Sequence, residues 1–444
     1  AGAARHLRRG GRRAARVVVR AHIDNLGRRW ETPLSRIGPP VDSPPPDDVP
    51  GRWRAGAGEL RVLCHTDDRV TALGWRHETL CLGTLSGLVR TVDVQSGSVV
   101  GEYYLGSHLP PSCITAMVFD GGSIAVGDRR GRVHVWRAQL TGSWGFEHSP
   151  DWVMADANAA EPGMAHDCAV TGLTTVDSGR VLLSADAAGT AHFWGPLEEP
   201  GAEPVRPSYT LQLQAPALAL CAEGAGGGRA YAGLEDGSLV QLFSEGEGGG
   251  WAAHVVQAPP LEAEGAAISA LAWDEASGSL LLGRAGGQIE RWHPELEAVC
   301  FPLLHAGAVC SLAVSLPAAA ADDSCEQVRH LVSAGSDGRV GVWDIDTGEP
   351  LWGLDGLSTD HLVALGDRSR LVAAGAVVNP AKGSQPTRRS WRSPLQHVTQ
   401  APACQAVVCV DMLGQPPAGG EGKPEPYWPS PEEQRLALRS GVAK

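Results

Sequence analysis

The stretch HLVSAGSDGRVGVWDIDTGEPLWGL, from His330 to Leu354, is the most regular part of this 444-residue chain. An apolar run leads to a polar turn that contains Gly338, and an alternating run then ends at Trp343 and Asp344 before a second turn. Two short apolar runs around a glycine-bearing turn predict a β-hairpin, because glycine adopts the positive φ that a tight turn requires. Whether this hairpin occurs once or recurs decides the fold class.

Five other segments of the chain repeat the pattern. In every copy an apolar or aromatic residue follows the turn glycine by five positions. The six pairs are Gly87 and Val92, Gly131 and Trp136, Gly189 and Trp194, Gly237 and Leu242, Gly287 and Trp292, and Gly338 and Trp343. Their end residues recur at intervals of 44 to 58 residues, which matches the roughly 40–45 residues of a four-stranded propeller blade with loop insertions. The sequence therefore predicts an all-β fold, a single β-propeller.

The sixth copy resembles the WD-repeat β-propeller family, since Trp343-Asp344 is the dipeptide after which the family is named. The resemblance covers about residues 61–413. It implies a hydrogen-bonded network within the blade, whose matching residues are His305, Ser333, Asp337 and Trp343. Other copies depart from the family pattern, because Val92 and Leu242 replace the tryptophan and only Asp236 and Asp337 stand at the turn position. We therefore expect this network to be intact only in the sixth blade.

The number of blades depends on how the chain closes. A seventh repeat begins near Asp360, but residues 379–395 interrupt its second hairpin with prolines and arginines. A propeller leaves no free sheet edge inside its ring, and a strand from one terminus can complete the last blade. Glu59 to His65 is the candidate for that strand. We expect seven four-stranded blades over residues 59–413, with six or eight as alternatives.

The flanking segments differ from the body in charge and composition. Residues 1–37 contain ten arginines against Asp24 and Glu31, a net +8, so the remainder of this −13 chain carries −21. Apolar residues at helical spacing predict that residues 1–36 form a basic helical arm that docks on the propeller or on a partner. A targeting sequence or contact with a polyanion through the arm are alternatives. Residues 37–58 are predicted to be a proline-rich linker and 414–444 an irregular tail. The candidate arm contacts are Arg8, Arg9, Arg12, Arg13 and Arg16.

The sequence contains no catalytic or metal-binding motif, and we expect no enzyme activity, cofactor or metal. What remains is surface: in a blade, the loop before the first strand and the turn between the second and third strands lie on one rim, where propellers commonly bind partners. The candidate rim residues are His65, Arg129, Arg130, Asp186 and Asp236, beside His305 and Asp337 of the sixth blade.

The ten cysteines are scattered, without CxxC pairs, and most lie in apolar runs. This pattern favours a reducing intracellular compartment. The cytoplasm is the preferred prediction, and an organelle matrix is the alternative. No run approaches the roughly 20 apolar residues that span a bilayer, so no membrane insertion is expected.

These observations favour a non-catalytic interaction scaffold or a structural subunit of a multiprotein complex. An RNA-associated subunit anchored by the basic arm is a second hypothesis, although the acidic body argues against a broad nucleic-acid surface. A substrate receptor of a ubiquitin ligase is a third, but no F-box-like Leu-Pro start precedes the linker.

Overall fold

The structure is a computed structural model in which residues 1–412 form one compact unit and residues 413–444 a second. All the residues that it describes lie in the first unit. They are residues 15–18, 22–23, 29–30, 33–37, 52–54, 59–66, 68–76, 79–105, 112–120, 123–137, 150–161, 163–195, 204–224, 228–246, 250–258, 265–293, 299–301, 305–315, 329–355, 357–358, 363–365, 370–377 and 405–411.

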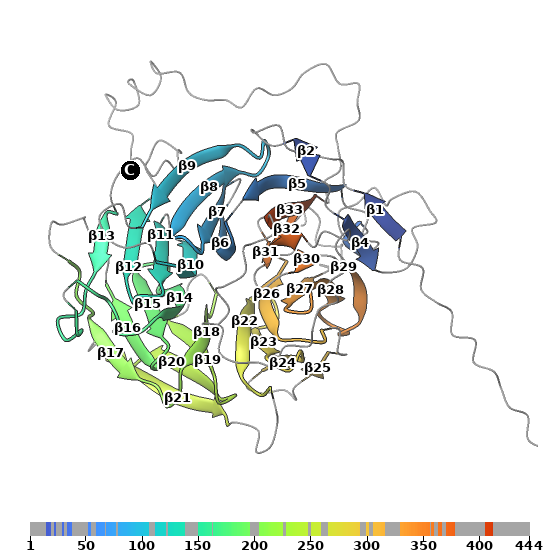
Figure 1. The fold of residues 1–444 in the computed structure, drawn as a ribbon. Coiled ribbons are helices and arrows are strands. Elements are labelled where there is room, and N and C mark those ends of the chain that lie inside the picture. Colours follow the sequence, from blue (N-terminus) through green and yellow to red (C-terminus); the bar gives the residue numbers. More distant parts are fainter. Residues whose placement is uncertain are drawn as a thin grey trace, which may run out of the picture. The chain divides into compact units, whose positions relative to one another are not determined.

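Six antiparallel sheets of consecutive strands follow one another along the chain (Figure 1). The first three blades are β6 (Val70–Arg76), β7 (Thr79–Thr84), β8 (Leu88–Asp93) and β9 (Val99–Tyr104); β10 (Ile114–Asp120), β11 (Ser123–Asp128), β12 (Val133–Arg137) and β13 (Trp152–Met154); and β14 (Val170–Val176), β15 (Val181–Asp186), β16 (Thr190–Trp194) and β17 (Tyr209–Gln212). The next three are β18 (Ala217–Ala222), β19 (Arg229–Leu234), β20 (Leu239–Ser244) and β21 (Trp251–Gln257); β22 (Ile268–Asp274), β23 (Ser279–Arg284), β24 (Ile289–Trp292) and β25 (Val299–Cys300); and β26 (Val309–Val314), β27 (His330–Gly335), β28 (Arg339–Asp344) and β29 (Pro350–Asp355).

The hairpin that defined the repeat is present in all six blades. The six turn glycines have φ between 82° and 88°, in the left-handed region that other residues rarely adopt. At Gly131 a Cβ atom would also overlap the carbonyl oxygen of His166. The first strand of every blade carries a bulge at the same place, for example between Ile114 and Ala116. The prediction of a repeated four-stranded unit is confirmed.

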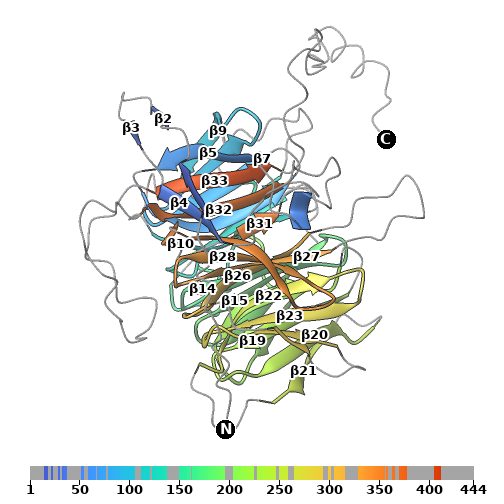
Figure 2. The same ribbon diagram turned by 90° about the vertical axis from the view of Figure 1, so that its right-hand side faces the viewer.

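A sheet of different construction closes the circle. Its strands are β30 (Leu357–Ser358), β31 (Val363–Leu365), β32 (Arg370–Val377), β33 (Gln405–Asp411) and β5 (Glu59–Thr66). Both β30 and β31 pair with β32, and β33 pairs with β32 and with β5 (Figure 2). The first strands of successive blades contact one another, and β31 contacts both β26 and β6. The fold is therefore a β-propeller, and the prediction that the Glu59–His65 segment supplies the closing strand is confirmed.

The expected count of seven regular blades is corrected to six. Among the described residues, six sheets contain four strands that follow one another in the chain, one of them extended by β4 and β1, whereas the closing sheet combines strands from both ends of the propeller. The physical reason lies in the sequence between β32 and β33, residues 378–404, which replaces the tight turn found in every other unit.

In the segment for which a helical arm is expected, the structure describes four short extended stretches; the other residues of the arm lie outside the described ranges, and the helix stays a prediction. The four stretches are β1 (Ala15–Val18), β2 (His22–Ile23), β3 (Arg29–Trp30) and β4 (Pro33–Ile37). Strand β4 pairs with the outer strand of blade six, where Ile37 lies opposite Gly353 and Ser35 opposite Asp355. The described part of this segment thus extends the sheet of blade six by β4 and β1.

The core lies between neighbouring blades. Phe193 of blade three stacks on Trp251 of blade four with ring centroids 4.1 Å apart, and Phe301 of blade five meets Trp343 of blade six edge-on at 6.1 Å. Neighbouring blades thus share apolar core clusters, for example blades three and four and blades five and six. Among the described residues there is no helix with the length and apolarity that a membrane crossing requires.

Candidate functional site

The four residues expected to form a network in blade six are hydrogen-bonded to one another. Nε2 of His305 lies 2.8 Å from the Ser333 hydroxyl, and the indole Nε1 of Trp343 donates to the same oxygen at 2.8 Å. Nδ1 of His305 lies 3.1 Å from a carboxylate oxygen of Asp337. The loop before the first strand is thereby joined to the second strand, the turn and the third strand.

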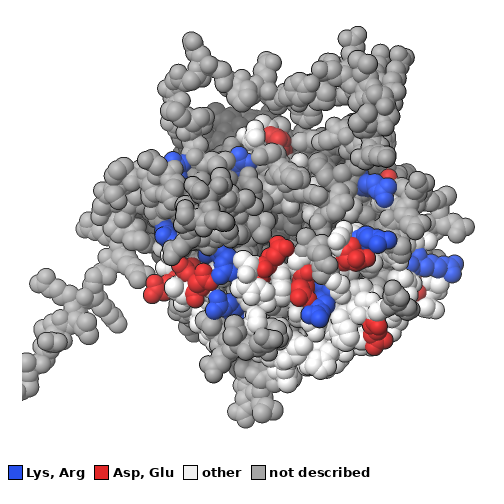
Figure 3. All heavy atoms as spheres, turned by 180° about the vertical axis from the view of Figure 1, so that it is seen from behind, with Lys and Arg blue, Asp and Glu red and all other residues white. Residues whose placement is uncertain are grey.

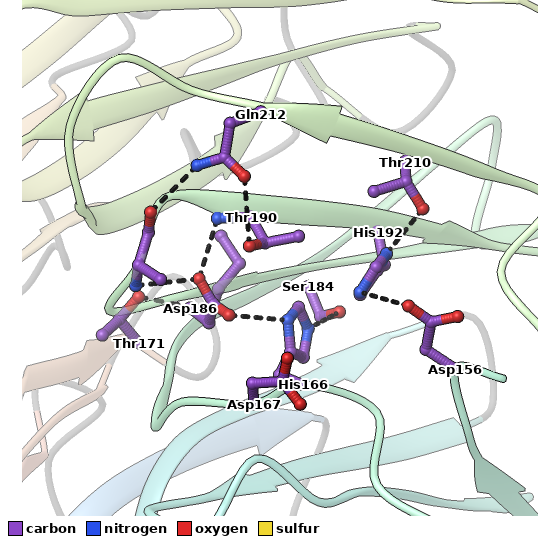
Figure 4. Close-up of polar contacts among 12 residues, drawn as sticks. Asp156, His166, Asp167, Thr171, Ser184, Asp186, Thr190, His192, Thr210 and Gln212 are labelled. Atoms are coloured by element: carbon purple, nitrogen blue, oxygen red, sulfur yellow. Dashed lines mark hydrogen bonds and ion pairs between the residues drawn. The ribbon is translucent and has the colours of Figure 1, made fainter. Parts of the chain in front are cut away.

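Blade three contains a second network of the same kind (Figure 4), contrary to the expectation that only blade six would have one. Nε2 of His166 lies 2.7 Å from the Ser184 hydroxyl. The indole of Trp194 donates to the same hydroxyl at 2.8 Å. Nδ1 of His166 lies 3.3 Å from Asp186. The sequence comparison missed this network because Asp186 precedes the glycine of the turn by three positions, whereas Asp337 precedes its glycine by one.

Both networks fix a protonation pattern. Because the indole donates to the serine oxygen, the serine hydroxyl can donate to Nε2 of the histidine, and the histidine then carries its proton on Nδ1, toward the carboxylate. Burial alone would raise the pKa of Asp186, but hydrogen bonds from His166 and from the backbone of Thr190 and Ala188 hold that pKa below its ordinary value. The pKa of Asp337 is lowered in the same way, by His305 and two backbone N–H groups.

The order Ser, His, Asp in these networks also resembles a hydrolytic triad, and burial decides against that interpretation. Ser184 and Ser333 are both 0% exposed, and a nucleophile must reach its substrate. Each serine oxygen is already occupied by a tryptophan donor. The networks brace the blades and are not candidates for chemistry.

Two other blades use buried ion pairs at the corresponding place. In blade two, Arg132 and Asp128 form an ion pair at 2.6 Å in which both side chains are at most 5% exposed. In blade five, Arg284 binds both carboxylate oxygens of Glu290, at 2.8 and 2.9 Å, and also donates to the carbonyl of Ala266. Each of these blades therefore fixes its turn with a different polar pair.

Three of the predicted rim residues are exposed on turns between the second and third strands. Arg129 and Arg130 lie on the turn of blade two and Asp236 on that of blade four. The turns are held by hydrogen bonds: the backbone N–H of Arg130 donates to Asp128 at 2.9 Å, and that of Ser238 donates to Asp236 at 2.8 Å. These residues combine exposed charge with fixed backbone, which is the arrangement that recognition of a partner needs.

The other two predicted rim residues are corrected. Asp186 is 1% exposed because it belongs to the buried network of blade three. His65 lies within strand β5 and not in the loop before the first blade, because the chain completes the closing sheet before it enters blade one. The prediction missed Glu235, which is exposed beside Asp236 on the same turn; its position directly before Asp236 and Gly237 was the available signal.

The rim is therefore bipolar, with two arginines on blade two and two acidic residues on blade four. On the side of the molecule turned away in Figure 1, acidic and basic side chains of the described residues also lie beside one another (Figure 3). This mixed distribution fits protein partners better than a uniformly charged polymer.

Other predicted features lie outside the described residues or remain predictions. Arg8, Arg9, Arg12 and Arg13 are not described, and of Arg16 only its place in β1 is known. No group of three or more metal-binding side chains occurs within the described ranges. The eight cysteines in those ranges form no disulfide, and the compartment stays a prediction.

Comparisons with known proteins bear on the fold. No protein family matches the chain, and no curated protein does. Among solved structures, U3-55K is 16% identical over 80% of this chain and 98% of its own, with a TM-score of 0.53. The computationally designed Ika8 protein is 21% identical over 72% of this chain and 84% of its own, with a TM-score of 0.46. The likeness to U3-55K supports the propeller fold alone.

Proposed function

We propose that this protein is a non-catalytic interaction scaffold, a subunit of a multiprotein complex that binds its partners through the rim formed by the turns between second and third strands. The observation that carries the proposal is the pair of oppositely charged turns, Arg129 and Arg130 on blade two and Glu235 and Asp236 on blade four, which are exposed while their backbones are fixed. Fixed turns lose little conformational freedom when they bind, and opposite charges define the orientation of a partner.

We further propose that the chain is a divergent WD-repeat propeller. The two buried networks of blades three and six, each built from a histidine, a serine, an aspartate and a tryptophan, support this proposal.

Affinity isolation with defined variants tests the scaffold function. The tagged full chain is compared with Arg129→Glu/Arg130→Glu and with Glu235→Lys/Asp236→Lys, at low and high salt, and co-purifying proteins and RNA are identified by mass spectrometry and sequencing. Arg180→Glu is the matched control, since Arg180 is exposed on a turn between first and second strands.

We expect the rim variants to lose protein partners that the wild-type chain and the control retain at high salt. Identical partners for all variants would overturn the rim as the binding surface. If RNA dominates and is lost at high salt or on removal of residues 1–14, which takes away four of the candidate arm arginines and keeps β4 and Trp53, the RNA-associated hypothesis replaces the scaffold.

A further inference from the structure

The outer strand of blade one, β9, has unusual exposure. Five large apolar side chains of the described residues are exposed, and three of them belong to this strand: Val99 (48%), Val100 (42%) and Tyr104 (56%). Strand β21 of blade four is longer but contributes only Val255 (40%). Exposed apolar residues concentrated on one edge strand indicate a place where another chain can pair.

Blade six provides an example of a further strand paired with the outer edge of a blade. Strands β9 and β29 occupy the same position in their blades, and both have a bulge after their first pair with the third strand. In this alignment Gly353 and Asp355 of β29 correspond to Glu102 and Tyr104 of β9. Both residues of β29 lie in the stretch from Gly353 to Asp355 that pairs with β4 in antiparallel direction. No described strand pairs with the corresponding edge of β9.

The backbone groups of β9 are oriented for this pairing. The N–H of Leu105 donates to the carbonyl of Gly87, toward the inside of the blade. Since backbone groups alternate in direction along an antiparallel strand, those of Tyr104 and Glu102 point outward. The side chains of Glu102 and Tyr104 alternate with that of Tyr103 and so share one face of the strand, and Val100, the residue of the bulge, is exposed two positions before Glu102.

Charge specifies the chemistry of the added strand. Glu102 is the acidic residue at the centre of β9, and its Oε1 accepts a hydrogen bond from Arg90 at 2.6 Å. The Glu102 side chain is 43% exposed, so a second cation can approach its carboxylate from solvent. The body beyond residue 37 also carries −21, which favours a basic segment over an acidic one.

We propose that the edge of β9 is a second interaction surface, which pairs with an extended segment of a partner protein. This segment has a lysine or arginine at its centre and an apolar residue two positions before and two positions after it. The cation faces Glu102, and the apolar residues face Tyr104 and Val100. The segment runs antiparallel to β9, as β4 does to β29. This surface is separate from the rim turns and goes beyond the scaffold function proposed for them.

A peptide titration tests this surface on the full chain. The probe is the labelled peptide acetyl-Thr-Ile-Thr-Lys-Thr-Ile-Thr-amide, and the control peptide has glutamate in place of lysine. Binding is followed by fluorescence anisotropy. Tyr104→Pro removes an outward N–H without removing a hydrogen bond of the blade, because proline is tolerated where the N–H faces solvent. Tyr104→Ser is its matched control, since it keeps the N–H.

The lysine peptide should bind the wild-type chain saturably and the glutamate peptide at least about tenfold more weakly. Tyr104→Pro should weaken the lysine peptide by about tenfold or more, and Tyr104→Ser by less. Glu102→Lys leaves the backbone intact and should reverse the preference between the peptides, which keeps the test valid if the proline variant does not fold.

Absence of saturable binding of the lysine peptide, or equal binding by Tyr104→Pro when that variant is folded, would overturn the proposal. The rim variant Glu235→Lys/Asp236→Lys should bind the peptide like wild type. The peptide titration therefore tests the β9 edge alone, whereas the affinity isolation with the rim variants tests the rim, so that a negative result in one experiment does not affect the other proposal.

Discussion

The indole Nε1 of Trp352 donates a 2.6 Å hydrogen bond to the main-chain carbonyl of Trp53, a residue 299 positions earlier in the chain. Trp53 lies in the segment predicted to be an extended linker, yet it is only 2% exposed. Its ring stacks on His330 with centroids 5.4 Å apart and packs between Val332 of blade six and Leu371 of the closing sheet. The N-terminal segment is thus fastened at the junction where the ring closes.

Trp53→Ala should therefore destabilise the propeller strongly. Loss of a fully buried tryptophan removes apolar contacts and leaves a cavity, and we expect the free energy of unfolding to fall by about 3–5 kcal/mol. Urea unfolding followed by circular dichroism measures the change. Arg54→Ala alters the exposed neighbour and should change stability by less than about 0.5 kcal/mol. Equal, small effects of both variants would show that the junction does not depend on Trp53.

Removing the shared hydroxyl of a buried network should weaken its blade. Ser184→Ala deprives the Trp194 indole of its acceptor and His166 of its partner, and Ser333→Ala does the same in blade six. A buried donor without a partner costs about 1–3 kcal/mol, so each variant should lose that much stability in denaturant titration. The two losses should add, because the sites share no residue. Ser336→Ala, on an exposed turn, is the control, and a loss as large there would contradict the argument.

The repeat and its turns could be predicted because they depend on local sequence. A positive φ selects glycine, and the spacing from Gly338 to Trp343 recurs at the other five turns. The Ser333 network was predicted from the resemblance of the sixth copy to a known repeat family, not from spacing alone. The closing strand β5 could be predicted because a ring must close and because an apolar run precedes the first blade.

The remaining features depend on contacts between distant residues. Asp186 reaches His166 from a different turn position than Asp337 does, so a fixed spacing rule missed it. The burial of Trp53 depends on Trp352 and on Leu371 of the closing sheet. These residues are far away in the sequence, so no local sequence pattern predicts the contacts. Strand β4 pairs with the outer strand of blade six, a contact more than 300 positions apart in the chain that no local spacing indicates.

Removing one partner of the Arg284–Glu290 ion pair in blade five should lower the free energy of unfolding much more than replacing both partners by apolar residues. Glu290→Gln leaves the Arg284 guanidinium, whose side chain is 4% exposed, without its counter-charge. Removing one partner of a buried pair costs about 3–5 kcal/mol, whereas Arg284→Met/Glu290→Leu should cost far less, because the desolvation penalty disappears with the charges. A double-mutant cycle in urea measures both. If the double variant is as unstable as Glu290→Gln, the turn depends on the arginine's hydrogen bond to Ala266 and not on the pair.

The stability of the protein should fall as the pH drops from about 6.5 to about 4. Burial lowers the pKa of His134, His192 and His330 from the ordinary 6.5 to about 4 in each case. Between pH 6.5 and pH 4 these histidines are protonated in the unfolded chain but not in the folded chain, so a lower pH favours unfolding. Above pH 6.5 they are neutral in both states, and the full stability is present. Each histidine can contribute at most about 3 kcal/mol to this loss.

His134→Leu isolates one of these contributions. Nδ1 of His134 is buried and has no hydrogen-bond partner in the described part of the structure, so leucine should preserve or improve stability at pH 7. It should also reduce the loss between pH 6.5 and 4 by up to about 3 kcal/mol, measured by urea unfolding at a series of pH values. His254→Leu, at an exposed position of β21, should leave the pH profile unchanged. A profile for His134→Leu that parallels wild type would mean that this histidine is protonated in the fold at no cost, and that the acid sensitivity arises elsewhere.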